Sequence, residues 1–172
     1  MRKSSFKKHI DQLNEEELRS ELMDLYDKLK GVKDYYKMEL GSSKDRLKKY
    51  DQAKQEIAAK YKTKSIRRPR RPRIQKIRKI LADLEKLSVL SFELIDVYLF
   101  DVESAIRFSI DYKFYSQVLE NNIRNSLNRA VDLMELNKME EEYKERCVSI
   151  LDQSRYIVGL EDQVRPILDR II

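Results

Sequence analysis

The chain has 172 residues, which is enough for one domain with a hydrophobic core and short for two. Its three glycines and three prolines argue against a β-rich fold, its 38% of charged residues is typical of long amphipathic helices, and its single cysteine, Cys147, excludes an intramolecular disulfide. The formal net charge is +6, and it comes from one local run of basic residues rather than from the chain as a whole. We therefore expect one all-α domain over residues 1–172.

The N-terminal part is predicted to form amphipathic helices, beginning with a short helix over residues 5–10. Asn14 follows as the N-cap of a second helix, with Glu17 three residues later as its capping-box partner. Gly31 is a point at which this helix could end or loosen, but apolar residues keep a helical period past it, so we expect the helix to continue to Leu40.

The sequence Gly41-Ser42-Ser43 predicts a break, and Ser42 is expected to cap a helix over residues 44–61. Residues 63–72 are interpreted as a basic connector within the domain, because two Arg-Pro steps prevent a helix there and favour extended backbone. Pro72 suits the first turn of the helix that follows, in which apolar residues recur at core spacing.

The second half of the chain is more apolar. After a break near Ser88–Ser91, a helix over residues 92–109 is apolar on most of its circumference, so we expect it to be central. Asp111 is interpreted as the N-cap of a further helix that ends near Asn137. One more helix, and a short last one after Gly159, complete an irregular bundle of about seven helices.

The positive charge is concentrated between Lys60 and Lys79, which we call the basic segment. It contains eleven basic residues and no acidic one, whereas the rest of the chain has 25 basic and 30 acidic residues. The helix after the connector begins among cations, although the helix dipole favours carboxylates at that end. Cations at this end of a helix are unfavourable, and no gain in stability that would offset them is evident. Their presence therefore indicates a function. The predicted binding residues are Arg67, Arg68, Arg70, Arg71, Arg73, Lys76 and Lys79.

These seven side chains are predicted to bind a phosphate-rich polyanion: RNA, DNA or a ribonucleoprotein. The planar fork of arginine suits phosphate oxygens. No aromatic residue occurs between Lys62 and Ser91, so base stacking is not available, and we expect phosphate contacts with little base specificity.

Two alternatives stay open. The basic segment is a solvated surface, or it docks within the chain on the acidic runs Glu15–Glu17 or Glu140–Glu142. Otherwise the protein is an interaction or oligomerisation module, in which the segment binds an acidic protein or the acidic face of a second copy.

The sequence indicates no enzyme. His9 is the only histidine, and Cys147 has no evident base beside it, so we expect a capping or surface role for the first and a packing role for the second. No phosphate-binding glycine motif or cysteine pair is present. We predict no catalytic residue, metal site, cofactor or small-molecule substrate.

Three carboxylates, Glu93, Asp96 and Glu103, line one side of the apolar helix over residues 92–109. The Glu-x-x-His pairing of di-iron bundles is absent. We therefore expect salt bridges that fix helix order, with Glu103 and Arg107 as one helical pair.

The seven aromatic residues of the segment from Phe92 to Tyr115 are expected to fill the core. No stretch of transmembrane length is free of charge, and the N-terminus lacks the apolar region of a signal peptide. We therefore expect no membrane association and a cytoplasmic location.

Four segments of the chain carry a resemblance to a known family. They are LMDLYDKLKGVKDYY (22–36), EIAAKY leading into IRRPRRPR (56–73), LIDVYLFDVESAIRFS (94–109) and KFYSQVLENNI (113–123). Together they resemble an uncharacterised bacterial family of small all-helical cytosolic proteins, classed as a domain of unknown function. That family also has a basic Arg-Pro segment between helices. The resemblance implies a cytosolic helical protein and supplies no activity, substrate or site residue.

Overall fold

The computed structural model describes residues 2–65, 67–87 and 92–172, so the predicted break near Ser88–Ser91 lies outside the described residues. The regular structure within these ranges is entirely helical, which confirms the all-α prediction, but there are nine helices rather than about seven. They are α1 (Lys3–Ile10), α2 (Glu15–Lys28), α3 (Lys30–Leu40), α4 (Ser43–Tyr61), α5 (Ile74–Leu87), α6 (Phe92–Tyr112), α7 (Gln117–Asn137), α8 (Glu140–Ser154) and α9 (Leu160–Leu168).

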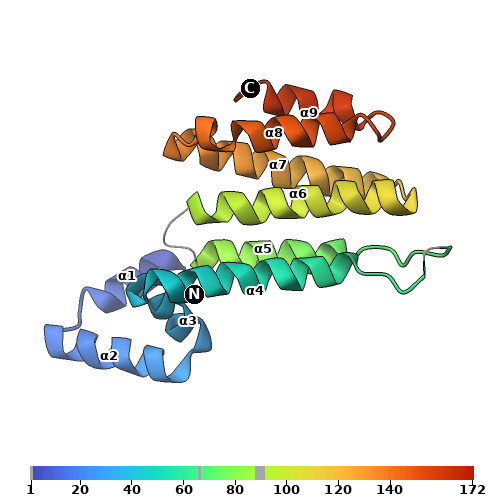
Figure 1. Ribbon diagram of the computed structural model, residues 1–172. Helices are drawn as coiled ribbons and strands as arrows, with labels where there is room; N and C mark the ends of the chain where they lie inside the picture. Colours follow the sequence, from blue (N-terminus) through green and yellow to red (C-terminus); the bar gives the residue numbers. More distant parts are fainter. Residues whose placement is uncertain (1, 66, 88–91) are drawn as a thin grey trace.

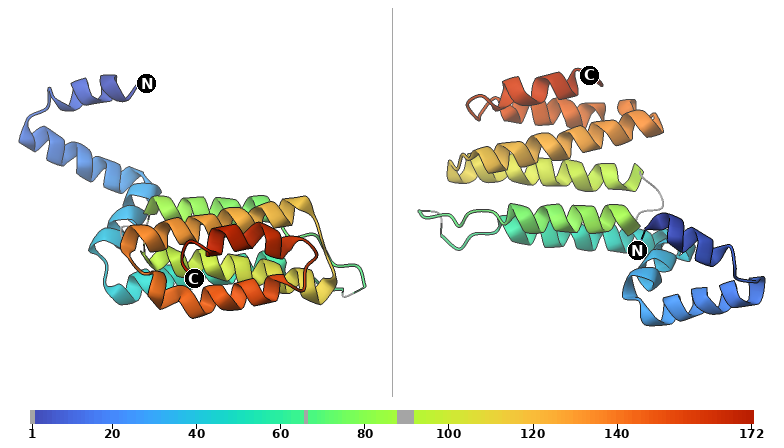
Figure 2. Two further views of the ribbon diagram at one scale, coloured as in Figure 1. Left: turned by 90° about the horizontal axis from the view of Figure 1, so that it is seen from above. Right: turned by 180° about the vertical axis from the view of Figure 1, so that it is seen from behind.

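The body of the molecule is a stack of helix pairs. Figure 1 shows α4 and α5 side by side, α6 and α7 above them, and α8 and α9 above those, and Figure 2 shows the same order from behind. Helix α6 packs against α4, α5, α7 and α8, so the most apolar helix is central, as expected. Helices α1–α3 project from one end of the stack (Figure 2).

One buried apolar cluster extends through the body, from Met38 on α3 to Ile171 after α9. Helices α1 and α2 contribute no buried residue, and α3 contributes only Met38. The hydrophobic effect therefore stabilises the stack of α4–α9 far more than the projecting N-terminal helices.

The predicted caps of the first helices are present. The Asn14 side chain accepts a hydrogen bond from the backbone N–H of Glu17, and the Glu17 carboxylate accepts one from that of Asn14, both at 2.9 Å. The Ser42 hydroxyl accepts one from the backbone N–H of Asp45 at 3.2 Å. Both caps satisfy amide groups that have no partner inside their helix.

The prediction of one helix over residues 15–40 is wrong. The chain breaks at Leu29 (φ −112°, ψ 113°), which ends α2 and caps α3. The break folds α3 back on α2, so that the rings of Tyr26 and Tyr36 lie 6.4 Å apart and the Lys33 ammonium lies 5.6 Å from the Tyr26 ring. Contact between helices overrides a periodicity that is continuous along the sequence.

Two further boundaries differ from the prediction. Asp111 is not an N-cap, because α6 continues to Tyr112 and ends in a left-handed turn at Lys113 (φ 48°). The cap of α7 is Ser116, whose hydroxyl accepts from the backbone N–H of Leu119. Pro72 precedes α5, which begins at Ile74, so it lies outside the first turn.

The expectation that the aromatic residues from Phe92 to Tyr115 fill the core is correct for Phe108, in the middle of this segment, and wrong for Phe92 and Tyr115 at its two ends. The ring of Phe108 is buried and lies 4.8 Å from that of Tyr112, 5.7 Å from that of Phe114 and 6.1 Å from that of Tyr61. Phe92 and Tyr115 are exposed. Phe92 is the first residue of α6 and Tyr115 lies in the loop between α6 and α7, so the helix period does not decide which side of either residue faces the core.

The corner between α3 and α4 requires a glycine. A Cβ atom at Gly41 would lie 2.1 Å from the carbonyl oxygen of Lys37, so the backbone would have to move. We expect Gly41→Ala to lower the free energy of unfolding by about 1–3 kcal/mol, as steric overpacking does. Gly31→Ala is the matched control, because nothing lies within 4 Å of its added Cβ and it lies in α3.

The control should be stabilising by about 0.5–1 kcal/mol, since alanine favours a helix over glycine. Urea unfolding followed by circular dichroism measures both variants. Equal effects of the two substitutions would contradict the close approach at Gly41.

Candidate functional site

The densest part of the basic segment is a loop between α4 and α5. The described residues from Lys62 to Arg73 are not helical, as the connector prediction states. The backbone N–H of Arg73 donates to the carbonyl oxygen of Lys60 at 3.4 Å and so joins the two ends of the loop. Figure 1 shows the loop projecting beyond the ends of α4 and α5, on the side away from α1–α3.

Hydrogen bonds of the Thr63 and Ser65 side chains connect the start of the loop to residues later in the loop. The Thr63 hydroxyl accepts from the backbone N–H of Arg70 at 3.0 Å and donates to the carbonyl oxygen of Ser65 at 3.2 Å. The Ser65 hydroxyl accepts from the backbone N–H of Arg68 at 3.2 Å. These bonds use backbone groups of the arginines and leave the guanidinium groups available to solvent.

All seven predicted binding residues are exposed. Five of them (Arg67, Arg68, Arg70, Arg71 and Arg73) lie in the loop, and Lys76 and Lys79 lie on the first two turns of α5. None of their side chains forms an ion pair with a carboxylate in residues 2–65, 67–87 and 92–172. The acidic runs Glu15–Glu17 and Glu140–Glu142 thus do not neutralise the basic segment in this conformation.

Most arginines outside the basic segment are paired with carboxylates. In the described part of the chain, seven of the ten arginines outside the basic segment form ion pairs; these are Arg19, Arg46, Arg129, Arg146, Arg155, Arg165 and Arg170. In the described part of the chain, all five loop arginines are without an ion pair, against three of the ten outside the basic segment, so unpaired guanidinium groups are concentrated in the loop. Within α5, Arg78 turns inward, and its Nε donates to Asn122 Oδ1 at 3.3 Å.

A buried polar network fixes the helices from which the loop projects. Asp101 of α6 is fully buried and accepts three hydrogen bonds, from Tyr61 (2.7 Å), Asn122 (2.8 Å) and Ser126 (2.7 Å). Tyr61 is the last residue of α4, and Asn122 also accepts from Arg78 of α5. The helix residues on both sides of the loop therefore connect to one buried carboxylate.

Burial raises the pKa of Asp101, although the hydrogen bonds from Tyr61, Ser126 and Asn122 favour its charged form. Burial also raises the pKa of Tyr61 well above its ordinary value, with a further increase from the nearby charge of Asp101. Sequence reasoning missed this network. The available signal was that Asp101 lies four residues from both Val97 and Ala105, on the apolar face of its helix.

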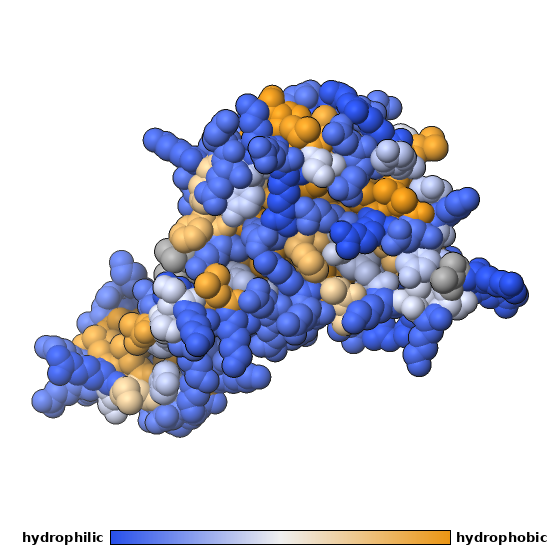
Figure 3. Space-filling view, in the orientation of Figure 1, coloured by the Kyte–Doolittle hydropathy of each residue, from blue (hydrophilic) through white to orange (hydrophobic). Residues whose placement is uncertain are grey.

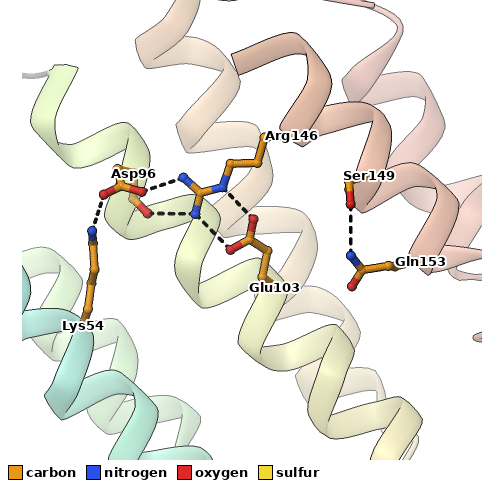
Figure 4. A network of polar contacts seen from close by, with 6 residues as sticks. All are labelled: Lys54, Asp96, Glu103, Arg146, Ser149 and Gln153. Carbon is orange, nitrogen blue, oxygen red and sulfur yellow. Dashed lines mark hydrogen bonds and ion pairs between the residues drawn. The ribbon is translucent and has the colours of Figure 1, made fainter. Parts of the chain in front are cut away.

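The carboxylates Glu93, Asp96 and Glu103 contact cations from other helices, as Figure 4 shows for the last two. Arg146 of α8 donates to Asp96 at 2.5 Å and to Glu103 at 2.6 and 2.9 Å, and Lys54 of α4 also pairs with Asp96. The guanidinium of Arg46 lies 3.9 Å from Glu93. The predicted pairing of Glu103 with Arg107 is wrong, because Arg146 reaches both oxygens of Glu103 from another helix.

Burial raises the pKa of Asp96, but hydrogen bonds from Lys54 and Arg146 outweigh it, so the pKa lies below its ordinary value. The described residues contain no group of three or more histidine, cysteine or acidic side chains arranged to hold a metal ion. The carboxylate row therefore joins α4, α6 and α8 through charged hydrogen bonds.

The remaining candidate residues lie apart from the loop. Cys147 is fully buried, and burial raises the pKa of its thiol to about 11, which disfavours the nucleophilic thiolate. His9 is exposed on α1, 3.4 Å from a Glu21 oxygen. Within the described ranges, the helices are too short or too polar to cross a membrane.

The fold and the loop define a class: an all-helical protein with an unpaired cationic loop between two helices of its body. The chain matches the family of unknown function DUF6155 over residues 1–161 and belongs to that family. Comparison with curated proteins and with solved structures gives no significant match.

Proposed function

We propose that this protein is a non-enzymatic binding protein for a phosphate-rich polyanion: RNA, DNA or a ribonucleoprotein. The observation that supports it is the exposure of Arg67, Arg68, Arg70, Arg71, Arg73, Lys76 and Lys79 without a carboxylate partner among the described residues. Each of these cations is free to contact a phosphate, and counterions released from the nucleic acid drive the association.

The loop geometry favours backbone contacts over base recognition. Arginine forks bind phosphate oxygens in pairs of hydrogen bonds. The described residues of the loop include no aromatic side chain on which a base can stack. The ligand is therefore bound through its phosphates, with affinity that depends strongly on salt and weakly on sequence.

The test is a salt titration of binding to RNA and to duplex DNA, with an acidic protein as a third ligand. With about six phosphate contacts, log K should fall with log salt with a slope of about −4 to −5. Replacing Arg67, Arg68, Arg70 and Arg71 with serine should bring that slope closer to zero by about 3–4, because each lost contact removes nearly one released ion.

A matched control removes the same charge at the opposite end of the molecule. Lys3, Lys7, Lys8 and Lys30 are exposed on α1 and at the start of α3, and their replacement with serine should leave the slope nearly unchanged. An equal loss in both variants would mean that net charge alone drives binding. Binding only to the acidic protein would instead support an interaction module that docks through its basic segment.

A further inference from the structure

A large groove lies at the N-terminal end of the molecule, between α2, α3 and the first half of α4. Its volume is about 1190 Å³, and its apolar lining includes Leu22, Met23, Tyr26, Met38 and Leu40. The exposed fractions of Leu22, Met23 and Leu40 are 50%, 61% and 79%. In Figure 3, apolar side chains gather over this part of the molecule, at the lower left.

The helices at this end have no core of their own. Neither α1, with eight residues, nor α2, with 14, has a buried residue. Helices of this length are marginal in water unless an apolar face is packed. A contiguous exposed apolar surface on helices that need packing marks a surface that another molecule covers.

The charges around the groove indicate what covers it. Helix α2 carries six acidic and two basic side chains, and of these eight the groove lining includes Arg19, which pairs with Glu15. The opposite wall, on α3 and α4, has three lysines, Lys37, Lys48 and Lys49, and none of them forms an ion pair within the described ranges. Asp34 and Asp45 lie on the same wall, and the Ser42 hydroxyl donates to Asp45 at 2.7 Å.

The occupant that fits is therefore an amphipathic acidic helix, and the chain itself provides one in α2. We propose that two copies form a two-fold symmetric dimer in which α2 of each copy packs its apolar side into the groove of the other. The acidic residues of α2 then face Lys37, Lys48 and Lys49 of the partner. Because the same surface serves both copies, the contact closes on itself and covers both grooves.

Sedimentation velocity and light scattering of the purified chain test this proposal. The expected mass is twice the 20.7 kDa of one chain. Leu22→Glu combined with Met23→Glu should raise the dissociation constant at least about tenfold, because it places charge in the apolar contact.

The matched control is Tyr156→Glu combined with Val158→Glu. These apolar side chains are 75% and 96% exposed at the turn between α8 and α9, so the change in charge is the same, and the dimer should persist. A second variant, Lys48→Glu with Lys49→Glu, should also weaken the dimer about tenfold, since it reverses the charge that faces α2. Thermal unfolding checks that all three variants fold.

Three results would overturn the dimer. The first is a monomer at concentrations up to about 100 μM, which corresponds to an affinity too weak for a stable contact. The second is a dimer that the change at Leu22 and Met23 leaves intact. The third is a dimer lost when Arg67, Arg68, Arg70 and Arg71 are replaced with serine, because the contact would then belong to the basic segment. If that variant loses polyanion binding but remains a dimer, the result supports a dimer contact that is separate from the basic segment.

Discussion

Replacing Asp101 with alanine is expected to lower the free energy of unfolding by about 3–5 kcal/mol. The substitution leaves the buried donors of Tyr61, Asn122 and Ser126 without their acceptor and opens a cavity at the centre of the stack. Urea unfolding measures the change.

Asp111→Ala is the matched control. Asp111 lies on the same helix and is exposed, so its loss should change the free energy of unfolding by no more than about 0.5 kcal/mol. A cost below about 1 kcal/mol for Asp101→Ala would contradict the role given to the buried network. Tyr61→Phe, which removes one of the three bonds, should cost about 1–2 kcal/mol.

The effect of Asp101→Ala should also depend on pH. Burial raises the pKa of Asp101 above its ordinary value of 3.8, so the folded protein takes up this proton at a higher pH than the unfolded chain. The contribution of Asp101 to stability therefore grows as the pH falls from above the raised pKa to below 3.8. The alanine variant lacks this gain, so its deficit relative to the wild type should increase in acid. A deficit that shrinks in acid would contradict the raised pKa.

Replacing Arg146 with methionine is expected to lower the free energy of unfolding by about 2–3 kcal/mol, somewhat less than a fully buried ion pair because the site is partly open to solvent. Methionine keeps much of the packing volume but leaves Glu103 without its cation and Asp96 with Lys54 alone. Guanidinium chloride is unsuitable for this measurement because it screens charges, so urea is used.

A double substitution separates the lost charge from the lost packing. In Arg146→Met with Glu103→Gln, no carboxylate is left unpaired at Glu103, so the loss should be smaller than the sum of the two single losses. Strict additivity would show that the ion pair contributes nothing.

The Arg146 network has the opposite pH dependence to Asp101. Hydrogen bonds from Lys54 and Arg146 outweigh the effect of burial and lower the pKa of Asp96. Its stabilisation is therefore present above its ordinary pKa of 3.8 and is lost as the pH falls through the lowered value. In Arg146→Met this acid-dependent loss should become smaller, because one of the two cations that lower the pKa is gone.

Features that depend on neighbours along the chain could be predicted from the amino-acid sequence. The caps at Asn14 and Ser42 follow from side chains that reach a backbone amide three residues away. The apolar circumference of α6 predicted its central place, and two prolines among arginines predicted a non-helical basic loop. Each of these features depends on the geometry of residues that are close together in the sequence.

Features that join residues distant in the sequence depend on how the helices pack, so they could not be predicted in this way. The break at Leu29 arises because α3 folds back on α2, and Arg146 rather than Arg107 pairs with Glu103 because α8 lies against α6. The acceptor role of Asp101 needs donors from two other helices, which no period along one helix reveals. The lack of ion pairs at the loop arginines also depends on tertiary structure, because a cation is unpaired only when the fold places the carboxylates elsewhere.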